Sequence, residues 1–257
     1  MGVFVVARDQ IFIGIAISQA STLGIALGMG AGMWLELHHV TWLGFDGFLS
    51  ATAVLFAILA ALLTARRSEA GGESHEAMTG WVFLISASLS ILLVAHTPHG
   101  LDEIQRLLSS SLVGATNSDV WLFVGSTDST NLALILANRR LLLFAMDPPM
   151  AAAVGMRMTR WTTGTAIWLG LVIGLAMRVL GMLYTFGLLV LPALVAKNAC
   201  REVRTIFFIS PIIALSVGTL GFVLANHYDF PPAQMTVALL SGLLVLAWLY
   251  QRRFATH

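Results

Sequence analysis

The feature that most constrains the fold of this chain is a series of eight apolar stretches, most of them close in length to a membrane-spanning helix. They lie at about residues 11–35, 47–65, 79–95, 120–138, 162–177, 179–196, 205–224 and 233–250. A helix needs roughly 20 apolar residues to cross the hydrocarbon core of a bilayer, and a backbone in lipid must satisfy its polar groups internally. The sequence therefore predicts an all-α, polytopic membrane protein with about eight transmembrane segments, some of them short or broken.

Charged residues are too rare here for a soluble domain. They make up 11% of the 257 residues, and hydrophobic residues make up 58%, whereas an average soluble domain has roughly 25% charged residues. We therefore treat residues 1–257 as a single transmembrane domain. The formal net charge of +1 gives no reason to expect a nucleic-acid partner. Cys200 is the only cysteine, which excludes an internal disulfide and a Cys-rich metal site.

Most of the basic residues mark one side of the membrane. Apart from Arg106 and Arg178, they fall at alternate breaks between the apolar stretches: Arg8, Arg66, Arg67, Arg139, Arg140, Arg157, Arg160, Lys197, Arg201, Arg204, Arg252 and Arg253. Because loops rich in Lys and Arg stay in the cytoplasm, these breaks are predicted to be cytoplasmic. The histidine-bearing breaks "ELHHVTWLGFDG", "HTPHGLDE" and "NHYDFPPAQ" are then predicted to face the outside.

The cytoplasmic break "FAMDPPMAAAVGMR" has the residues of a short helix outside the membrane. Asp147 suits the N-cap, Pro148 and Pro149 suit the first helical positions, and Gly155 suits the end. Its alanines, Ala151 to Ala153, form a small apolar face that would allow close approach of a cytoplasmic partner. The alternative is a connecting loop that only caps two spans.

Asp128 and Pro192 are the two outliers within the apolar stretches. An ionised Asp near the middle of a span costs about 2.5–3.5 kcal/mol, so we expect this helix to turn its polar face away from lipid. Asp128 then either lines a watery pathway as a cation or proton site, or is protonated and hydrogen-bonded in the packing. Pro192 is expected to break or kink its helix and to lie inside the bundle, where the freed carbonyl can be satisfied.

Four motifs together resemble those of the transmembrane permeases of the zinc, manganese and iron ATP-binding-cassette importers. They are "GVFVVARDQIFIGIAISQASTLGIALG", "FAMDPPMAAAVGM", "RVLGMLYTFGLLVLPALVAKNA" and "NHYDFPPAQMTVAL", and they extend over nearly the whole chain. The resemblance implies that Asp147, Pro148, Ala151, Ala152 and Gly155 belong to the segment that docks on the ATPase.

The same resemblance implies the rest of the system. ATP would be hydrolysed on a separate cytoplasmic ATP-binding-cassette ATPase, and an extracytoplasmic metal-binding protein would deliver zinc, manganese or iron. Two copies of this chain, or this chain and a related permease, would enclose the pathway in a bacterial inner membrane. No cofactor would be held covalently by this chain.

The sequence departs from the family's motifs at the start. The family has an Asp and a His four residues apart on its second helix, and here these positions are Ile15 and Gln19. Isoleucine cannot ligate a metal ion, and an amide is a poor substitute for imidazole. A divergent subunit that moves another substrate, or no longer transports, is therefore the alternative. The family's first helix has no counterpart after Met1, so we expect an apolar segment upstream of it.

Histidines and acidic residues in the outer breaks are candidates for a metal site, because imidazole and carboxylate suit zinc, manganese and iron. The alternative is that these side chains are merely solvated or help a binding protein to dock. The candidates are His38, His39, His96, His99, His227 and Asp229.

An intramembrane enzyme is the competing class, and its motifs are missing. The sequence "HEAMT" lacks the second histidine of a zinc-protease motif, no G-x-S-x-G stretch occurs, and Asp128 has no second aspartate within the spans to pair with. A phosphate-binding loop of the G-x-x-x-x-G-K-[ST] type is missing too. The sequence therefore predicts a transport subunit with no catalytic residue of its own.

Overall fold

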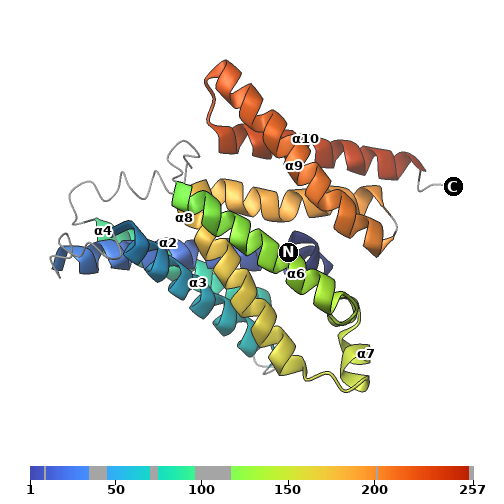
Figure 1. Ribbon diagram of the computed structural model, residues 1–257, viewed down its shortest axis with the longest axis horizontal. Coiled ribbons are helices and arrows are strands. Elements are labelled where there is room, and N and C mark those ends of the chain that lie inside the picture. Colours follow the sequence, from blue (N-terminus) through green and yellow to red (C-terminus); the bar gives the residue numbers. More distant parts are fainter. Residues whose placement is uncertain (9, 35–44, 70–74, 96–116, 201, 255–257) are drawn as a thin grey trace.

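The computed structural model describes all of the chain except residues 9, 35–44, 70–74, 96–116, 201 and 255–257, and every regular element in the described part is a helix (Figure 1). The elements are α1 (Gly2–Ala7), α2 (Ile11–Trp34), α3 (Phe45–Glu69), α4 (His75–Val94), α6 (Asn117–Met146), α7 (Pro148–Ala153), α8 (Met158–Ala199), α9 (Val203–Tyr228) and α10 (Pro232–Phe254). Seven stretches within the described helices are long and apolar enough to cross a membrane. The all-α, multi-pass prediction is confirmed.

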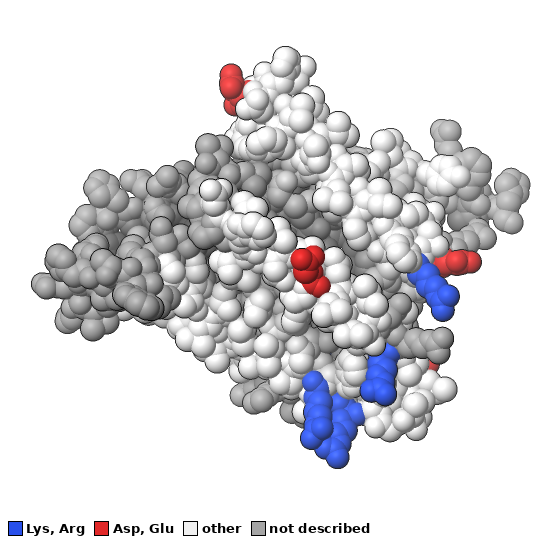
Figure 2. All heavy atoms as spheres, viewed as in Figure 1, with Lys and Arg blue, Asp and Glu red and all other residues white. Residues whose placement is uncertain are grey.

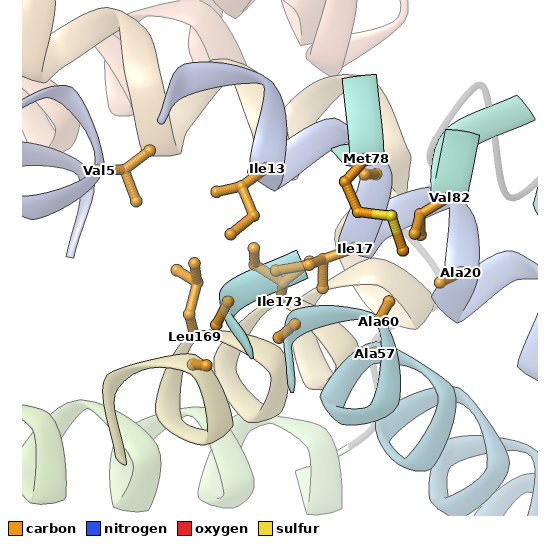
Figure 3. Packing of buried hydrophobic residues seen from close by; sticks show 14 residues of the cluster. Val5, Ile13, Ile17, Ala20, Ala57, Ala60, Met78, Val82, Leu169 and Ile173 are labelled. Atoms are coloured by element: carbon orange, nitrogen blue, oxygen red, sulfur yellow. The ribbon is translucent and has the colours of Figure 1, made fainter. Parts of the chain in front are cut away.

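Helix α2 is the centre of the molecule and packs against α3, α4 and α8. In its apolar window, 78% of the residues are buried, because small and branched side chains alternate on all its sides. Figure 3 shows Ile13 and Ile17 in a cluster to which these four helices and α1, through Val5, contribute. Alanines make up much of the rest of this cluster. Small side chains allow the close helix contacts on which association in a membrane depends.

The contact between α3 and α8 shows how close this packing is. A Cβ atom at Gly174 would lie 2.8 Å from the Cα atom of Val54 and 3.0 Å from the Cβ atom of Ala57. One turn earlier, a Cβ atom at Gly170 would lie 2.7 Å from the Cα atom of Ile58. Glycine at both positions therefore allows two membrane-spanning backbones to touch.

Helix α8 covers two of the predicted apolar stretches, and its second part, Val179–Ala199, is one of the seven candidate spans. It is 42 residues long, and Gly181 interrupts it with φ 73° and ψ 171°. Only glycine adopts this backbone conformation readily, so the chain turns there, three residues after the predicted break at residue 178 and within the predicted stretch 179–196. The first part of α8 packs on α3, whereas the second part contacts α2 through Leu189 and α10 through the close approach of Gly187 to Val237.

The expected break at Pro192 is not where α8 bends. Gly181 is the residue with non-helical dihedral angles, and the helix continues through Pro192. The side chain of Pro192 is fully buried, as we expected for a proline inside the bundle. The physical reason is that neighbouring helices hold the second part of α8 straight: α1 packs directly on it, with Gly2 against Leu189 and Ala193.

Helices α6, α9 and α10 form the periphery. Helices α9 and α10 pack on each other and on α8, whereas α6 packs mainly on α1, α7 and α8. None of the residues in the apolar window of α6, Val120–Ala137, is buried. Figure 2 shows the Lys and Arg side chains of this face gathered at one edge, near α7 and near the turn from α8 to α9. This distribution agrees with the predicted cytoplasmic side.

Candidate coupling segment and transport pathway

The short helix α7 lies between the end of α6 and the start of α8, as predicted. The carboxylate of Asp147 accepts a hydrogen bond from the backbone N–H of Met150 at 3.0 Å, and Pro148 and Pro149 begin the helix. Gly155 follows with φ 83°, a left-handed conformation that lets the chain turn back toward α8. The local signals in the sequence are thus sufficient to place this helix.

One side of α7 is packed and the other is open. Ala151 is fully buried, whereas Ala152 and Ala153 are exposed. Met150 and Val154 beside them are 51% and 63% exposed. The open side is therefore small and apolar, which is the kind of surface that a groove in another protein can cover closely.

Aromatic side chains fix the base of this segment. Phe144, near the end of α6, is fully buried and stacks on Phe4 of α1 with 5.8 Å between ring centroids. On its other side it meets Trp161 of α8 at 6.2 Å. The guanidinium of Arg8 lies over the Phe144 ring at 4.5 Å, a cation–π contact. Three helices are joined at the point from which α7 projects.

The Ile15 and Gln19 positions lie on one strip of α2 together with Phe12, because residues three and four apart share a helix face. Phe12 is 63% exposed, Ile15 is half-buried, and Gln19 is 6% exposed. The side chains of this strip are therefore exposed at its predicted cytoplasmic end, at Phe12, and become buried two turns further along the helix, at Gln19. Near Gln19, Ser21 has a buried hydroxyl without a hydrogen-bond partner among the described residues.

Asp128 lies on the outer surface of this single chain. Two residues further on, Thr130 faces inward and accepts a hydrogen bond from the indole N–H of Trp168 at 3.3 Å. A separation of two residues turns the side chain about 200° around a helix, so Asp128 is exposed on the opposite side of α6. Thr130 thus faces the rest of the chain, whereas Asp128 does not. That the polar face of this helix turns away from lipid stays a prediction, because it concerns the assembled protein in a membrane.

Comparison with known proteins agrees with this architecture. Residues 1–251 match the ABC 3 transport family. The chain belongs to this family. The manganese import system permease protein ScaB of Streptococcus gordonii is 24% identical over 246 residues, which are 96% of this chain and 83% of ScaB. The chelated iron transport system membrane protein YfeD of Yersinia pestis is 21% identical over 248 residues, 96% of this chain and 78% of YfeD.

A solved structure shows the same fold. PsaBC from Streptococcus pneumoniae in complex with Fab matches with a TM-score of 0.78 at 20% identity, over 96% of this chain and 84% of the PsaBC chain. The predicted family is therefore confirmed.

Two of the six candidate ligands of the predicted outer metal site, His227 and Asp229, lie among the described residues. His38, His39, His96 and His99 lie outside the described residues. His227 in the last turn of α9 and Asp229 at its C-cap are both exposed, and the imidazole packs edge-on against Tyr228 with 4.9 Å between centroids. The described residues contain no group of three His, Cys, Asp or Glu side chains close enough to share a metal ion.

Three features of the site were missed by reasoning from the sequence. These are the break at Gly181, the aromatic junction under α7 and the exposure of Asp128. A signal near Gly181 was available, since the sequence has an arginine at position 178 between the apolar stretches 162–177 and 179–196, three residues before this glycine. No sequence signal pointed to the aromatic junction, because Phe4, Phe144 and Trp161 are far apart in the sequence and resemble ordinary apolar residues.

Proposed function

We propose that this chain is the membrane-spanning permease of an ATP-binding-cassette importer, and that α7 is the segment that docks on a separate cytoplasmic ATPase. The observation that carries the proposal is the geometry of α7: a capped helix with a small apolar open side, anchored by the Phe4, Phe144 and Trp161 rings. Force applied to α7 would pass through this junction into α1, α6 and α8.

A divalent transition metal is the substrate class that we propose. The names of ScaB and YfeD refer to manganese and to chelated iron, and this chain shares the family's fold. The strip of Phe12, Ile15 and Gln19 would line the inner half of the pathway, since it is open only toward the cytoplasm. Because neither Ile15 nor Gln19 is a good ligand, the ion would pass this point without tight binding. Asp128 and Pro192 remain further candidates for the pathway.

Two partners complete the proposal. An extracytoplasmic metal-binding protein would supply the ion on the outer side. A second permease copy, or a related permease, would cover the open part of α2, where the side chain of Phe12 is exposed on an otherwise buried helix. ATP would bind only to the ATPase subunits.

The test of α7 is a charge on its open side. Ala152→Glu should leave the protein inserted and folded but abolish substrate-stimulated ATP hydrolysis in the reconstituted permease–ATPase complex, because the carboxylate would be buried at the interface without a partner. Ala199→Glu is the matched control, since Ala199 is also exposed and lies on the cytoplasmic side, at the end of α8. Equal ATP hydrolysis in Ala152→Glu and wild type would show that α7 does not dock there.

A subunit that no longer transports is the second candidate, and Ile15 and Gln19 favour it. Hydrolysis of ATP that responds to manganese, zinc or iron delivered by the binding protein separates the two. A complex that assembles but whose ATP hydrolysis does not respond to metal would support a subunit that no longer transports.

A further inference from the structure

Three arginines from two segments, the end of α6 and the start of α8, line one pocket beside α7. Arg140 comes from α6, Arg157 precedes α8, and Arg160 lies in its first turn. The pocket has a volume of about 430 Å³ and also contains Leu143, Trp161 and the Val154–Met156 turn. All three arginines are exposed, and the described residues supply no carboxylate that pairs with any of them. Figure 2 shows the basic side chains at this edge, where α6 ends and α8 begins.

An apolar cavity continues directly from this basic pocket. Its volume is about 260 Å³, and it shares Arg160 and Trp161 with the basic pocket. Its walls come from α1, α6, α8 and α9 and consist mostly of Phe4, Leu134, Leu141, Trp168 and Phe207. Leu134, Leu141 and Phe207 also line a groove of about 810 Å³ between α6 and α9. The pocket of the arginines thus adjoins the apolar cavity, which in turn adjoins the groove between α6 and α9.

We propose that this space binds one anionic phospholipid of the cytoplasmic leaflet. The phosphate would lie among Arg140, Arg157 and Arg160, and an acyl chain would occupy the cavity and the groove. Guanidinium groups bind phosphate through paired, charge-assisted hydrogen bonds, and basic pockets between transmembrane helices on the cytoplasmic side are typical sites for anionic headgroups. Trp161, at the junction, has the place that indole rings favour between water and hydrocarbon.

A lipid explains both halves of the space, which a free anion does not. Inorganic phosphate or a nucleotide phosphate would use the three arginines and leave the apolar cavity unfilled. A phospholipid would also add packing contacts to α6, because this helix has few contacts with the rest of the chain. The acyl chain would lie between α6 and α9, where the structure leaves a groove lined by Leu134 and Ile212.

The position of the headgroup has a consequence for α7. Arg140 precedes α7 and Arg157 follows it, so one phosphate bound by both would hold the two ends of this segment together. Lipid binding would then order α7 before it meets a partner. This consequence rests on the proposed docking function of α7, but the lipid site does not.

The experiment is native mass spectrometry of the purified full-length chain, with bound lipid counted after exchange against phosphatidylglycerol or phosphatidylcholine. Wild type should retain one phosphatidylglycerol and release phosphatidylcholine. Arg160→Gln should weaken phosphatidylglycerol binding about fivefold, and the triple change of Arg140, Arg157 and Arg160 to Gln should abolish it, since each basic residue near an anionic surface contributes a factor of about five. Arg252→Gln, which alters an exposed cytoplasmic arginine outside the pocket, should have no effect.

A second variant tests the acyl-chain cavity without touching a charge. Gly164 lines the cavity, and a Cβ atom there would meet nothing within 4 Å. Gly164→Leu should therefore fill the cavity without a clash and reduce phosphatidylglycerol retention at least tenfold. Gly242→Leu is the matched control, because Gly242 is also a helical glycine with open space around its Cβ position and lies in α10, outside the cavity.

Two results would overturn the lipid site. One is equal retention of the two phospholipids. The other is competition of inorganic phosphate for the arginines together with unchanged binding in Gly164→Leu, which would mean that a free anion is bound. Because these measurements need no ATPase, a failure of α7 to dock would leave the lipid result intact, and loss of the lipid would leave Ala152→Glu as a separate test.

Discussion

Restoring the two missing ligands on α2 should create a metal site in this permease. The change is Ile15→Asp together with Gln19→His. These positions are four residues apart and therefore project from the same side of α2, so a carboxylate and an imidazole could share one ion. The wild-type Ile15 and Gln19 should bind transition metal weakly or not at all, because neither is a good ligand.

The magnitude follows from where these side chains lie. Gln19 is 6% exposed and Ile15 is half-buried, within a membrane-spanning helix. An ionised Asp at the centre of a span costs about 2.5–3.5 kcal/mol, so the metal-free double variant should be less stable than wild type by an amount of this order. A bound ion at 1,000 times its Kd stabilises the folded state by about 4.1 kcal/mol, which more than offsets the loss.

The assay is metal-dependent thermal unfolding in detergent of wild type, both single variants and the double variant, with zinc and with manganese. We expect the double variant to melt below wild type without metal and to gain on the order of 10 °C at saturating metal. The gain should exceed the sum of the two single variants, because one ligand alone holds an ion weakly. Tight stoichiometric metal at the wild-type positions, or a merely additive gain in the double variant, would refute this account of α2.

Two further predictions concern the glycines that shape α8. Gly181→Ala should lower the free energy of unfolding by about 1–3 kcal/mol, because an L-residue is strained at φ 73°. The control Gly242→Ala, at a helical position with open space around the Cβ atom, should instead be neutral or stabilising. Equal effects of the two changes in chemical denaturation would contradict the strain argument. Gly174→Ala should lower the free energy of unfolding by about 1–3 kcal/mol through overpacking, since the added Cβ atom would press on Val54 and Ala57. A melting temperature at or above that of wild type would show that α3 and α8 can move apart to accept the Cβ atom without loss of stability.

Much of the fold could be predicted from local rules. The apolar stretches marked the spans, the arginines marked the cytoplasmic side, and Asp147 with two prolines marked α7. Each of these depends on residues that are neighbours in the sequence. The residues Ile15 and Gln19 drew attention through the resemblance to the family's motif, in which an Asp and a His are implied at these positions, and helical spacing places the two on one face.

The rest depended on contacts between distant segments. The sequence indicated an interruption at Pro192, whereas in the structure the non-helical residue is Gly181 and the helix continues through Pro192, where α1 and α10 pack against the second part of α8. Asp128 was expected to face inward on grounds of energy, but the few contacts of α6 leave it on the outer surface of this chain. Hydropathy predicts that a segment crosses the membrane and says little about its rotation, which neighbouring helices determine.

The sequence by itself determined the class of protein, the approximate positions of most of its spans and the short helix α7, since apolar segments and helix caps are made by residues that are close together in the chain. Only the tertiary structure decided that Phe4, Phe144 and Trp161 meet beneath α7, and that Arg140, Arg157 and Arg160 meet above an apolar cavity. These residues come from different helices, and their meeting depends on how small side chains in α2, α3 and α8 let the helices approach.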